Sequence, residues 1–547
     1  MMRWIFAMLA GAALALAACA PKGEEAPEHR RSAEPEPEPA GYAAEGVIAG
    51  TLPEISAALA AGETTSEALV EAYIARIERV DWDGPRLQSV LALNPGALED
   101  ARASDARRAA GAALGPLDGV PILLKDNIES ADPMPTTAGA LALEDNVTGR
   151  DAPLAAGLRA AGAVILGKTN LSQWANFRSN DSMSGWSALG GQVRNPHMLD
   201  RNPCGSSSGS GVAVAASLAA GAVGTETNGS IICPSTVNGI VGFKPTVGLV
   251  SQSHIVPISF SQDAAGPMTK TVRGAAMMLG AMATGEAKTD YVAALDADAL
   301  RGARIGVARF AQGENAQVTA LFDAALEDLK AAGATLVEIE DFQPAADDFW
   351  SKARAVLEYE FKATVNDYLA EAAPAVETRD LDALIAFNEE HADVELALFD
   401  QSLFEASAAR GGLDEPEYLE ARAAIQRATR EEGIDRLLAE NEVDVIVSPS
   451  GPLPGRIDPV NGDVWPAWAG AGYLAAIAGY PHLSVPMGTV RGAPVGISFI
   501  GAKDDDARVL ALGYAYEQRT KHRAEPAYLP GAEALPEIAA AMRRKAQ

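Results

Sequence analysis

The stretch Val223-Gly224-Thr225-Glu226-Thr227-Asn228-Gly229-Ser230-Ile231-Ile232-Cys233-Pro234 joins a short apolar strand to a glycine-containing turn. Such a turn holds a hydroxyl out of a sheet while nearby backbone N–H groups converge on one point. This is the arrangement of a nucleophile beside an oxyanion hole. The stretch therefore predicts Ser230 as the nucleophile of an enzyme.

Two features upstream strengthen this prediction. The serine-rich turn Gly205-Ser206-Ser207-Ser208-Gly209-Ser210-Gly211 follows a proline and leads directly into an alanine-rich segment, which indicates an ordered helix start rather than a flexible linker. Lys125 ends the apolar run Val120-Pro121-Ile122-Leu123-Leu124. A lone lysine there is normally a surface residue that closes a strand. The combination of all three features makes a catalytic lysine the better interpretation.

Composition limits the class of protein. The chain has 547 residues, of which 48% are hydrophobic and 21% charged, enough for the core of an enzyme-sized globular body. The 73 acidic residues against 44 basic ones give a net charge of −29, which argues against nucleic-acid binding. The scattered histidines and the absence of paired-cysteine spacing predict no metal site.

The N-terminus has the pattern of an export signal in residues 1–18, where Arg3 precedes an apolar stretch too short to span a bilayer comfortably. The sequence Leu16-Ala17-Ala18-Cys19 resembles a bacterial lipoprotein box, which predicts lipidation of Cys19. A simple secretory peptide cleaved nearby is the alternative. Ala20 gives no acidic signal for inner-membrane retention, so we expect an outer-membrane anchor that faces the periplasm.

Residues 19–45 are rich in Pro, Glu and Ala and predict an extended, solvated tether between that anchor and a domain over 46–547. Within the domain, strands alternate with helices, which predicts an α/β fold: a single α/β/α domain with a central, mixed and mostly buried sheet. Residues 275–441 are mainly helical and are expected to elaborate this core. The expected strands include 90–93, 120–125, 161–167, 443–447 and 492–500, and the expected helices include 64–80, 212–220 and 506–520.

Two stretches match known functional motifs by sequence but lack the structural context that these motifs need. Residues 162–169 match the sequence pattern of a phosphate-binding loop, but the four residues between its two glycines form an apolar strand instead of a phosphate cradle. Residues 205–209 match the nucleophile elbow of α/β-hydrolases, but the preceding residues are polar and broken by proline where that fold needs a strand.

Two cysteines remain besides Cys19. Export permits a disulfide between Cys204 and Cys233, but both also suit small, buried, free thiols, which is the interpretation that we favour from the sequence.

Several separate motifs, in order, resemble the amidase signature family: Gly119–Asn127, Gly205–Gly209, Gly229-Ser230-Ile231 and Gly242–Thr246. The resemblance covers about residues 48–526 and includes the spacing of 24 positions from Ser206 to Ser230. Details such as Pro203-Cys204-Gly205 look most like the peptide amidase branch.

The resemblance implies a Ser-Ser-Lys triad. Ser230 would be the nucleophile, Ser206 a bridging serine held through a cis peptide bond with Ser207, and Lys125 the general base. Burial in its apolar strand would depress the pKa of this lysine and keep it neutral.

The oxyanion would be met by backbone N–H groups among Thr227, Asn228, Gly229 and Ser230, with Ser207 and Asp126 in support. The implied reaction converts a carboxamide, either a C-terminal peptide amide or a small neutral amide, to a carboxylate and ammonia. It needs no metal, cofactor or obligate protein partner.

The chain departs from the family pattern at a few positions. Asn228 and Ser208 stand where many members have glycine, and Ile232 and Cys233 occupy a stretch where many place an arginine that can pair with a substrate carboxylate. We therefore expect neutral amides as substrates.

Two other functions compete with hydrolysis. A non-catalytic, membrane-tethered binding lipoprotein would not need a lysine in an apolar setting. The subunit that supplies ammonia to charged tRNA has a similar fold but belongs in the cytosol, which the export pattern excludes.

Overall fold

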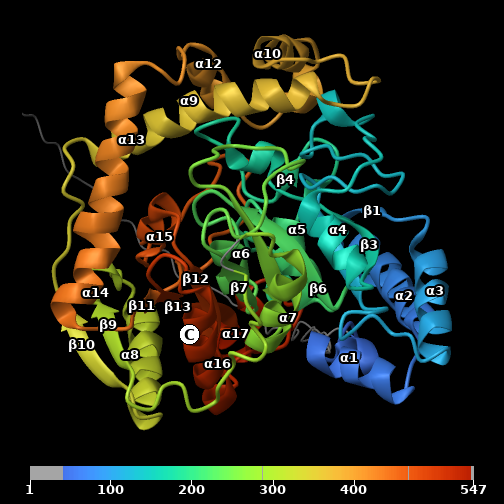
Figure 1. The fold of residues 1–547 in the computed structure, drawn as a ribbon, viewed down its shortest axis with the longest axis horizontal. Helices are drawn as coiled ribbons and strands as arrows, with labels where there is room; N and C mark the ends of the chain where they lie inside the picture. The colour runs from blue at the N-terminus through green and yellow to red at the C-terminus, as the bar shows by residue number, and fades with distance from the viewer. Residues whose placement is uncertain (1–40, 286–287, 466, 544–547) are drawn as a thin grey trace, which may run out of the picture. The chain divides into compact units, whose positions relative to one another are not determined.

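Eleven strands form one mixed sheet through the centre of the computed structural model, which describes residues 41–285, 288–465 and 467–543 (Figure 1). The predicted export signal and Cys19 lie outside the described residues, as does most of the predicted tether. In spatial order the strands are β1 (Val90–Leu93), β3 (Val164–Thr169), β2 (Pro121–Lys125), β6 (Gly221–Glu226), β8 (Ala264–Thr269), β7 (Val241–Lys244), β12 (His482–Val490), β13 (Ala493–Ile500), β11 (Val445–Pro449), β9 (Arg304–Ala308) and β10 (Thr335–Ile339).

The sheet is parallel in two blocks and antiparallel elsewhere. β2 runs parallel to β3 and β6, and β9 runs parallel to β10 and β11. The strands between these blocks pair in antiparallel fashion, and β1 is an antiparallel edge strand. A small separate hairpin joins β4 (Trp186–Ser187) and β5 (Gly191–Gln192). The predicted α/β fold with a mixed sheet is confirmed.

Helices cover both faces of the sheet, as the alternation of side chains along β12 shows. Leu483 and Val485 lie against Gly513 of α16, where a Cβ atom would meet their side chains. The intervening Ser484 points the other way and lies 3.4 Å from Thr236 Oγ1 of α6. Successive residues of a strand face opposite sides, so α16 and α6 lie on different faces.

The described α-helices are α1 (Leu52–Ala61), α2 (Ser66–Arg76), α3 (Ala97–Ala109), α4 (Pro153–Ala160), α5 (Ser208–Ala215), α6 (Ile232–Val237), α7 (Val272–Met282), α8 (Ala316–Ala331), α9 (Phe349–Ala370), α10 (Leu381–Glu390), α11 (Ala392–Glu395), α12 (Ser402–Ala408), α13 (Pro416–Thr429), α14 (Asp435–Asn441), α15 (Gly472–Ala478), α16 (Asp506–Thr520) and α17 (Pro536–Met542). Figure 1 shows α9 along one end of the body, with α10 and α12 beside it and α13 along a second edge. β9 and β10, from the same segment 275–441, add two strands to one end of the central sheet, and α8 lies between them in the sequence.

Several predicted elements coincide with the structure, among them β1 and α16, but the helix predicted over 212–220 is wrong. α5 begins at Ser208 and ends at Ala215, and Gly221 begins β6. Ser217 adopts a left-handed backbone with φ of 58°, which stops the helix despite its alanine-rich continuation. β8 and β12 were not predicted; each contains a proline, as β2 and β13 also do, and each forms through pairing with neighbouring strands.

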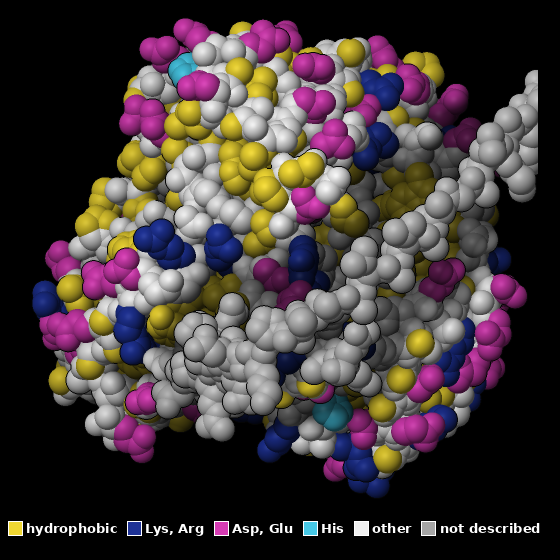
Figure 2. All heavy atoms as spheres, turned by 180° about the vertical axis from the view of Figure 1, so that it is seen from behind, with side chains coloured by type: hydrophobic (Ala, Val, Ile, Leu, Met, Phe, Trp, Pro, Cys, Tyr) yellow, Lys and Arg dark blue, Asp and Glu magenta, His cyan; other side chains and the backbone are white. Residues whose placement is uncertain are grey.

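The surface fits the acidic composition. Figure 2 shows acidic side chains along the rim of one face, with Lys and Arg scattered and hydrophobic side chains between them. Within the described part of the chain, no helix combines the length and apolar character needed to cross a membrane.

Candidate active site

The sheet places the three residues of the predicted triad next to one another. Lys125 is the last residue of β2, Ser206 precedes α5, and Ser230 lies in the turn between β6 and α6. β2 and β6 are parallel neighbours with Leu124 opposite Val223, so their carboxyl ends meet at one edge. This register brings Lys125 beside Thr225, two residues further along β6.

Lys125 is fully buried, and each of its short hydrogen bonds ends on a hydroxyl. Its Nζ lies 2.8 Å from Ser206 Oγ and 2.8 Å from Thr225 Oγ1. Burial lowers the pKa of Lys125 to about 7, although the carboxylates of Asp263 and Glu226 oppose this shift. A large neutral fraction at physiological pH is what a general base requires.

The turn that carries Ser230 presents unused backbone donors. Among the described residues, the N–H groups of 227–230 donate to no other group. The next two N–H groups, of Ile231 and Ile232, donate to Glu226 Oε2 at 2.8 and 3.0 Å, which fixes the turn. Donors held in place but unpaired are the requirement for an oxyanion hole.

Asn228 does not strain this turn. The left-handed conformation falls on Gly229, with φ of 84°, whereas Asn228 has no positive φ. The substitution of asparagine for the family's glycine is therefore compatible with the turn.

Ser207 connects the two serine-bearing segments. Its N–H donates to the carbonyl oxygen of Ser230 at 3.1 Å, and its Oγ donates to the carbonyl oxygen of Thr225 at 2.9 Å. The described structure contains no hydrogen bond between Ser206 Oγ and Ser230 Oγ. Catalytic hydrogen bonds often form only when substrate is bound.

The cis peptide bond lies one position earlier than we expected. It joins Gly205 to Ser206, not Ser206 to Ser207. Glycine is required at position 205 because a Cβ atom there would collide with Ser172 Oγ.

Asp126 serves another part of the fold. Its carboxylate accepts hydrogen bonds from the backbone N–H of Thr137 at 3.2 Å and from Thr137 Oγ1, and lies 3.8 Å from Lys168 Nζ. It follows Lys125 directly and no hydrogen bond joins their side chains. Its support for the site is thus indirect, through the segment that contains Thr137.

The prediction of free thiols is wrong: Cys204 and Cys233 form a disulfide, with their Cα atoms 5.9 Å apart. The bond ties the segment before Ser206 to the start of α6, three residues after Ser230. Two cysteines separated by 29 positions gave no local signal of this contact, which depends on how β6 and α6 pack against the serine-rich turn.

Ser230 opens into a cleft made of three adjoining cavities. The first, about 250 Å³, contains Ser230 and is lined by Phe177, Leu357 and Trp465. A second of about 530 Å³ continues past Trp465 to α9, and a third of about 340 Å³ lies beside Trp468. The walls of the cleft combine aromatic and apolar side chains with polar ones, which is typical of a site for an organic substrate.

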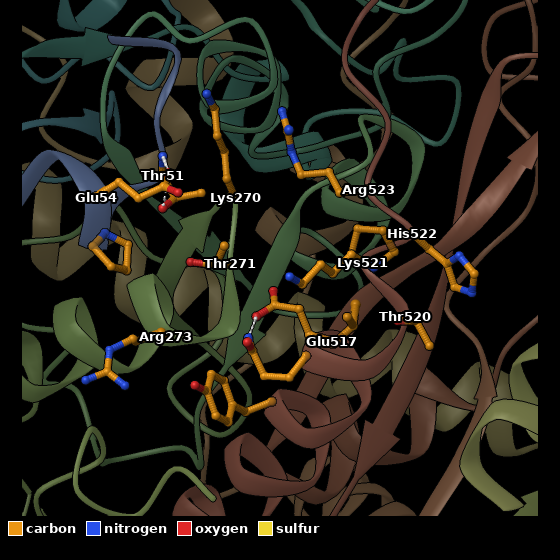
Figure 3. Close-up of a pocket in the computed structure, with 15 residues that line it drawn as sticks. Thr51, Glu54, Lys270, Thr271, Arg273, Glu517, Thr520, Lys521, His522 and Arg523 are labelled. Carbon is orange, nitrogen blue, oxygen red and sulfur yellow. Dashed lines mark hydrogen bonds between the residues drawn. The ribbon is translucent and has the colours of Figure 1, made fainter. Parts of the chain in front are cut away.

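A separate hollow of about 420 Å³ lies between residues 51–54, the start of α7 and the end of α16 (Figure 3). It is lined by several basic side chains, but none of the triad residues reaches it. Figure 3 shows Lys270 and Arg523 extending away from Glu517. Lys270 Nζ donates to Ala49 O at 2.8 Å and to Ser217 Oγ at 2.6 Å, so this lysine fastens the N-terminal segment to the body.

Within the described ranges, no cluster of three or more His, Cys, Asp or Glu side chains is arranged to hold a metal ion.

Several residues of the site were not predicted from the sequence. Thr225 and Glu226 stand in the opening stretch, but nothing local indicated that one contacts Lys125 and the other fixes the turn. Asp263 was also not predicted; its Oδ1 accepts a hydrogen bond from the Thr227 hydroxyl at 2.6 Å. The cleft residues Asp463 and Trp465 come from a distant loop with no recognisable pattern.

Comparison with known proteins places this geometry in context. The model of the Amidase family matches residues 68–510. A probable amidase of Arabidopsis thaliana is 36% identical over 88% of this chain and 91% of its own. One glutamyl-tRNA(Gln) amidotransferase subunit, from Halorhodospira halophila, is 35% identical over 86% of this chain and 97% of its own. The solved native peptide amidase of Stenotrophomonas maltophilia is 45% identical and superimposes with a TM-score of 0.82, covering 87% of this chain and 98% of its own.

Proposed function

The chain belongs to the amidase family and is an amide C–N hydrolase. We propose that it hydrolyses C-terminal peptide amides and that Ser230, Ser206 and Lys125 carry out the reaction. The contact between a buried lysine of lowered pKa and Ser206 Oγ, next to the turn that carries Ser230, is the observation that carries this proposal.

In the proposed reaction, the Ser230 hydroxyl gives its proton to Ser206 Oγ while the Ser206 proton passes to Lys125 Nζ. Ser230 Oγ attacks the amide carbonyl carbon, and the unpaired N–H groups of 227–230 bind the oxyanion. When the C–N bond breaks, the proton returns through the same relay to the leaving nitrogen, which departs as ammonia. Water then attacks the acyl ester by the reverse relay and releases a carboxylate.

An acyl part without a carboxylate beside the scissile bond fits the surroundings of Ser230. The cavity that contains Ser230 has no Lys or Arg among its described lining residues, and Ile232 and Cys233 occupy the stretch where an arginine would pair with a carboxylate. Walls that combine aromatic, apolar and amide side chains suit a peptide. The likeness to a peptide amidase supports the same class of substrate.

We further propose that the protein is exported and held to the outer membrane on the periplasmic side by lipid on Cys19. The lipoprotein-like sequence before Cys19 supports this location, as does the disulfide between Cys204 and Cys233, because disulfides persist in oxidising compartments. An exported chain is separated from charged tRNA, so we do not extend the activity of the amidotransferase relative to it.

The central experiment combines ammonia release from N-acetylated dipeptide amides with fluorophosphonate labelling. We expect Ser230→Ala to abolish labelling and to lower kcat by at least about 1,000-fold, and Lys125→Ala to do nearly the same. Ser235→Ala is the matched control, because this buried serine lies in α6 and its hydroxyl has no partner among the described residues. It should retain both signals.

Turnover by the Ser230→Ala protein at the wild-type rate would refute the mechanism. Rapid hydrolysis of malonamate-like substrates would refute the preference for amides without a carboxylate beside the scissile bond. The mass of the mature N-terminus tests the anchor: we expect an acylated Cys19, and an unmodified chain that begins elsewhere would contradict it.

A further inference from the structure

A carboxylate lies in the cleft, whose walls combine aromatic and apolar side chains with uncharged polar ones and Arg354. Asp463 lies in the loop between β11 and α15 and lines both the cavity of Ser230 and the adjoining cavity toward α9. Among the described residues that line the three cavities of the cleft, no other Asp or Glu is present. A carboxylate in such a place is either a structural anchor for its loop or a counter-charge for a ligand.

Two close hydrogen bonds hold the carboxylate of Asp463 through one of its oxygens. Both of them end on Oδ1, from the Ser184 N–H at 3.0 Å and from Asn202 Nδ2 at 2.7 Å. They account for a structural role of Oδ1, because Asn202 Oδ1 in turn accepts the N–H of Cys204 at 2.8 Å. Oδ2 takes part in neither bond, and no salt bridge joins Asp463 to a described basic residue.

The basic group in the cleft does not neutralise this carboxylate. Arg354 of α9 lines the outer cavity, where its Nη1 donates to Asn180 Oδ1 at 2.9 Å. Burial raises the pKa of Asp463, while hydrogen bonding, with a contribution from the Trp465 side chain, opposes this shift. A bound cation would offset the cost of holding the charge away from water.

Aromatic rings surround the same position. Trp465 lines both cavities with Asp463, and its ring packs edge-on against that of Trp468 at 6.0 Å between centroids. Indole faces attract ammonium and guanidinium groups, and a carboxylate beside them adds a direct ion pair. A carboxylate beside an indole ring is a usual arrangement for binding an organic cation.

We infer that Asp463 selects peptide amides that carry a positive charge on the acyl part, either a basic side chain or a free N-terminal ammonium. This inference rests on the proposed amide hydrolysis at Ser230. Substrate would enter with its carboxamide at Ser230 and its cationic group at Asp463 Oδ2, beside the indole of Trp465. Asp463 is a specificity residue in this scheme and takes no part in the chemistry.

The test compares kcat/KM for two matched pairs of substrates. Acetyl-leucyl-argininamide is paired with acetyl-leucyl-citrullinamide, which has nearly the same shape without the charge. Leucyl-leucinamide is paired with its N-acetylated form. We expect the wild-type protein to prefer the charged member of at least one pair by about tenfold or more.

Asp463→Asn keeps an oxygen for Ser184 and Asn202 but removes the charge. We expect it to abolish the preference, because kcat/KM falls more for the charged member of each pair than for the neutral member. Asp458→Asn is the matched control: it removes a carboxylate from the same loop but lies outside the described cavities, so the preference should persist.

Each result decides the inference. A wild-type protein that hydrolyses the charged and neutral members of both pairs equally would overturn it, even if Asp463→Asn fails to fold. A preference that survives in a folded Asp463→Asn protein would also overturn it. If no amide is hydrolysed and Ser230 is not labelled, the proposed function fails instead, so the two failures are distinguishable.

Discussion

Replacing Lys125 with methionine should make the protein more stable at neutral pH while it abolishes activity. The unfolded chain holds this lysine protonated up to its ordinary pKa of 10.5, whereas burial lowers the pKa in the folded protein to about 7. Between these values the unfolded state binds more protons, so wild-type stability rises with pH across this window. Methionine has a similar length and no charge, so it folds without the free-energy cost of losing a proton.

The size of the effect follows from the two pKa values. Releasing the proton on folding costs about 4 kcal/mol at pH 7 and about 2 kcal/mol at pH 9. Lys125→Met also removes a hydrogen-bond partner from Ser206 Oγ and from Thr225 Oγ1, which costs about 1 kcal/mol each. We therefore expect the variant to be more stable than the wild type by about 2 kcal/mol at pH 7 and equally stable near pH 9.

Urea-induced unfolding followed by tryptophan fluorescence at both pH values, with the disulfide intact, measures this difference. Taking the difference between two proteins cancels the titration of the other buried groups. Lys330→Met, which removes an exposed lysine, is the control for a change in net charge. A variant less stable than the wild type at pH 7, or a difference that stays constant from pH 7 to pH 9, would refute the reasoning.

Three further predictions concern the same site. The kcat/KM for an uncharged amide should rise with pH with an apparent pKa of about 7, because only neutral Lys125 accepts the proton; a flat profile from pH 6 to pH 8 would contradict this. Cys204→Ser should lower the free energy of unfolding in urea by about 3 to 4 kcal/mol, since the disulfide closes a long loop, and an unchanged midpoint would argue against the bond. Glu226→Ala should lower kcat about 100-fold by freeing the turn of the oxyanion hole. It should also move the acidic limb of the pH profile to lower pH, because the Glu226 carboxylate raises the pKa of Lys125; a limb that stays in place would show that it acts on the turn alone.

Much of the candidate site was accessible from local sequence, because each of its members marks the end of a regular element. Lys125 ends an apolar strand, Ser206 stands before a helix, and Ser230 follows a strand in a glycine-containing turn. These positions depend on residues a few places away, which is the range over which hydrophobic periodicity and turn chemistry act. The family resemblance then supplied the roles that the pattern left open.

The errors share a physical cause. The helix predicted over 212–220 followed alanine propensity, which tertiary contacts override, and the structure ends the helix at Ala215. The cysteines were assigned as free because small, buried thiols suit both positions. Their contact could not be predicted, since it depends on how the serine-rich turn packs against α6. β8 and β12 were missed because their strand structure depends on pairing with neighbouring strands in the folded sheet, which no local pattern reports.

By itself, the sequence determined the α/β class, the acidic character and the three residues on which the proposed chemistry depends, since each follows from composition, from a pattern within one element or from the family resemblance. Only the tertiary structure decided that Lys125 lies 2.8 Å from Ser206 Oγ, that Cys204 and Cys233 are bonded, and that Asp463 faces the cleft of Ser230. These contacts join segments tens to hundreds of residues apart. They arise from the order and register of the strands, which pairing across the whole sheet fixes and no local pattern encodes.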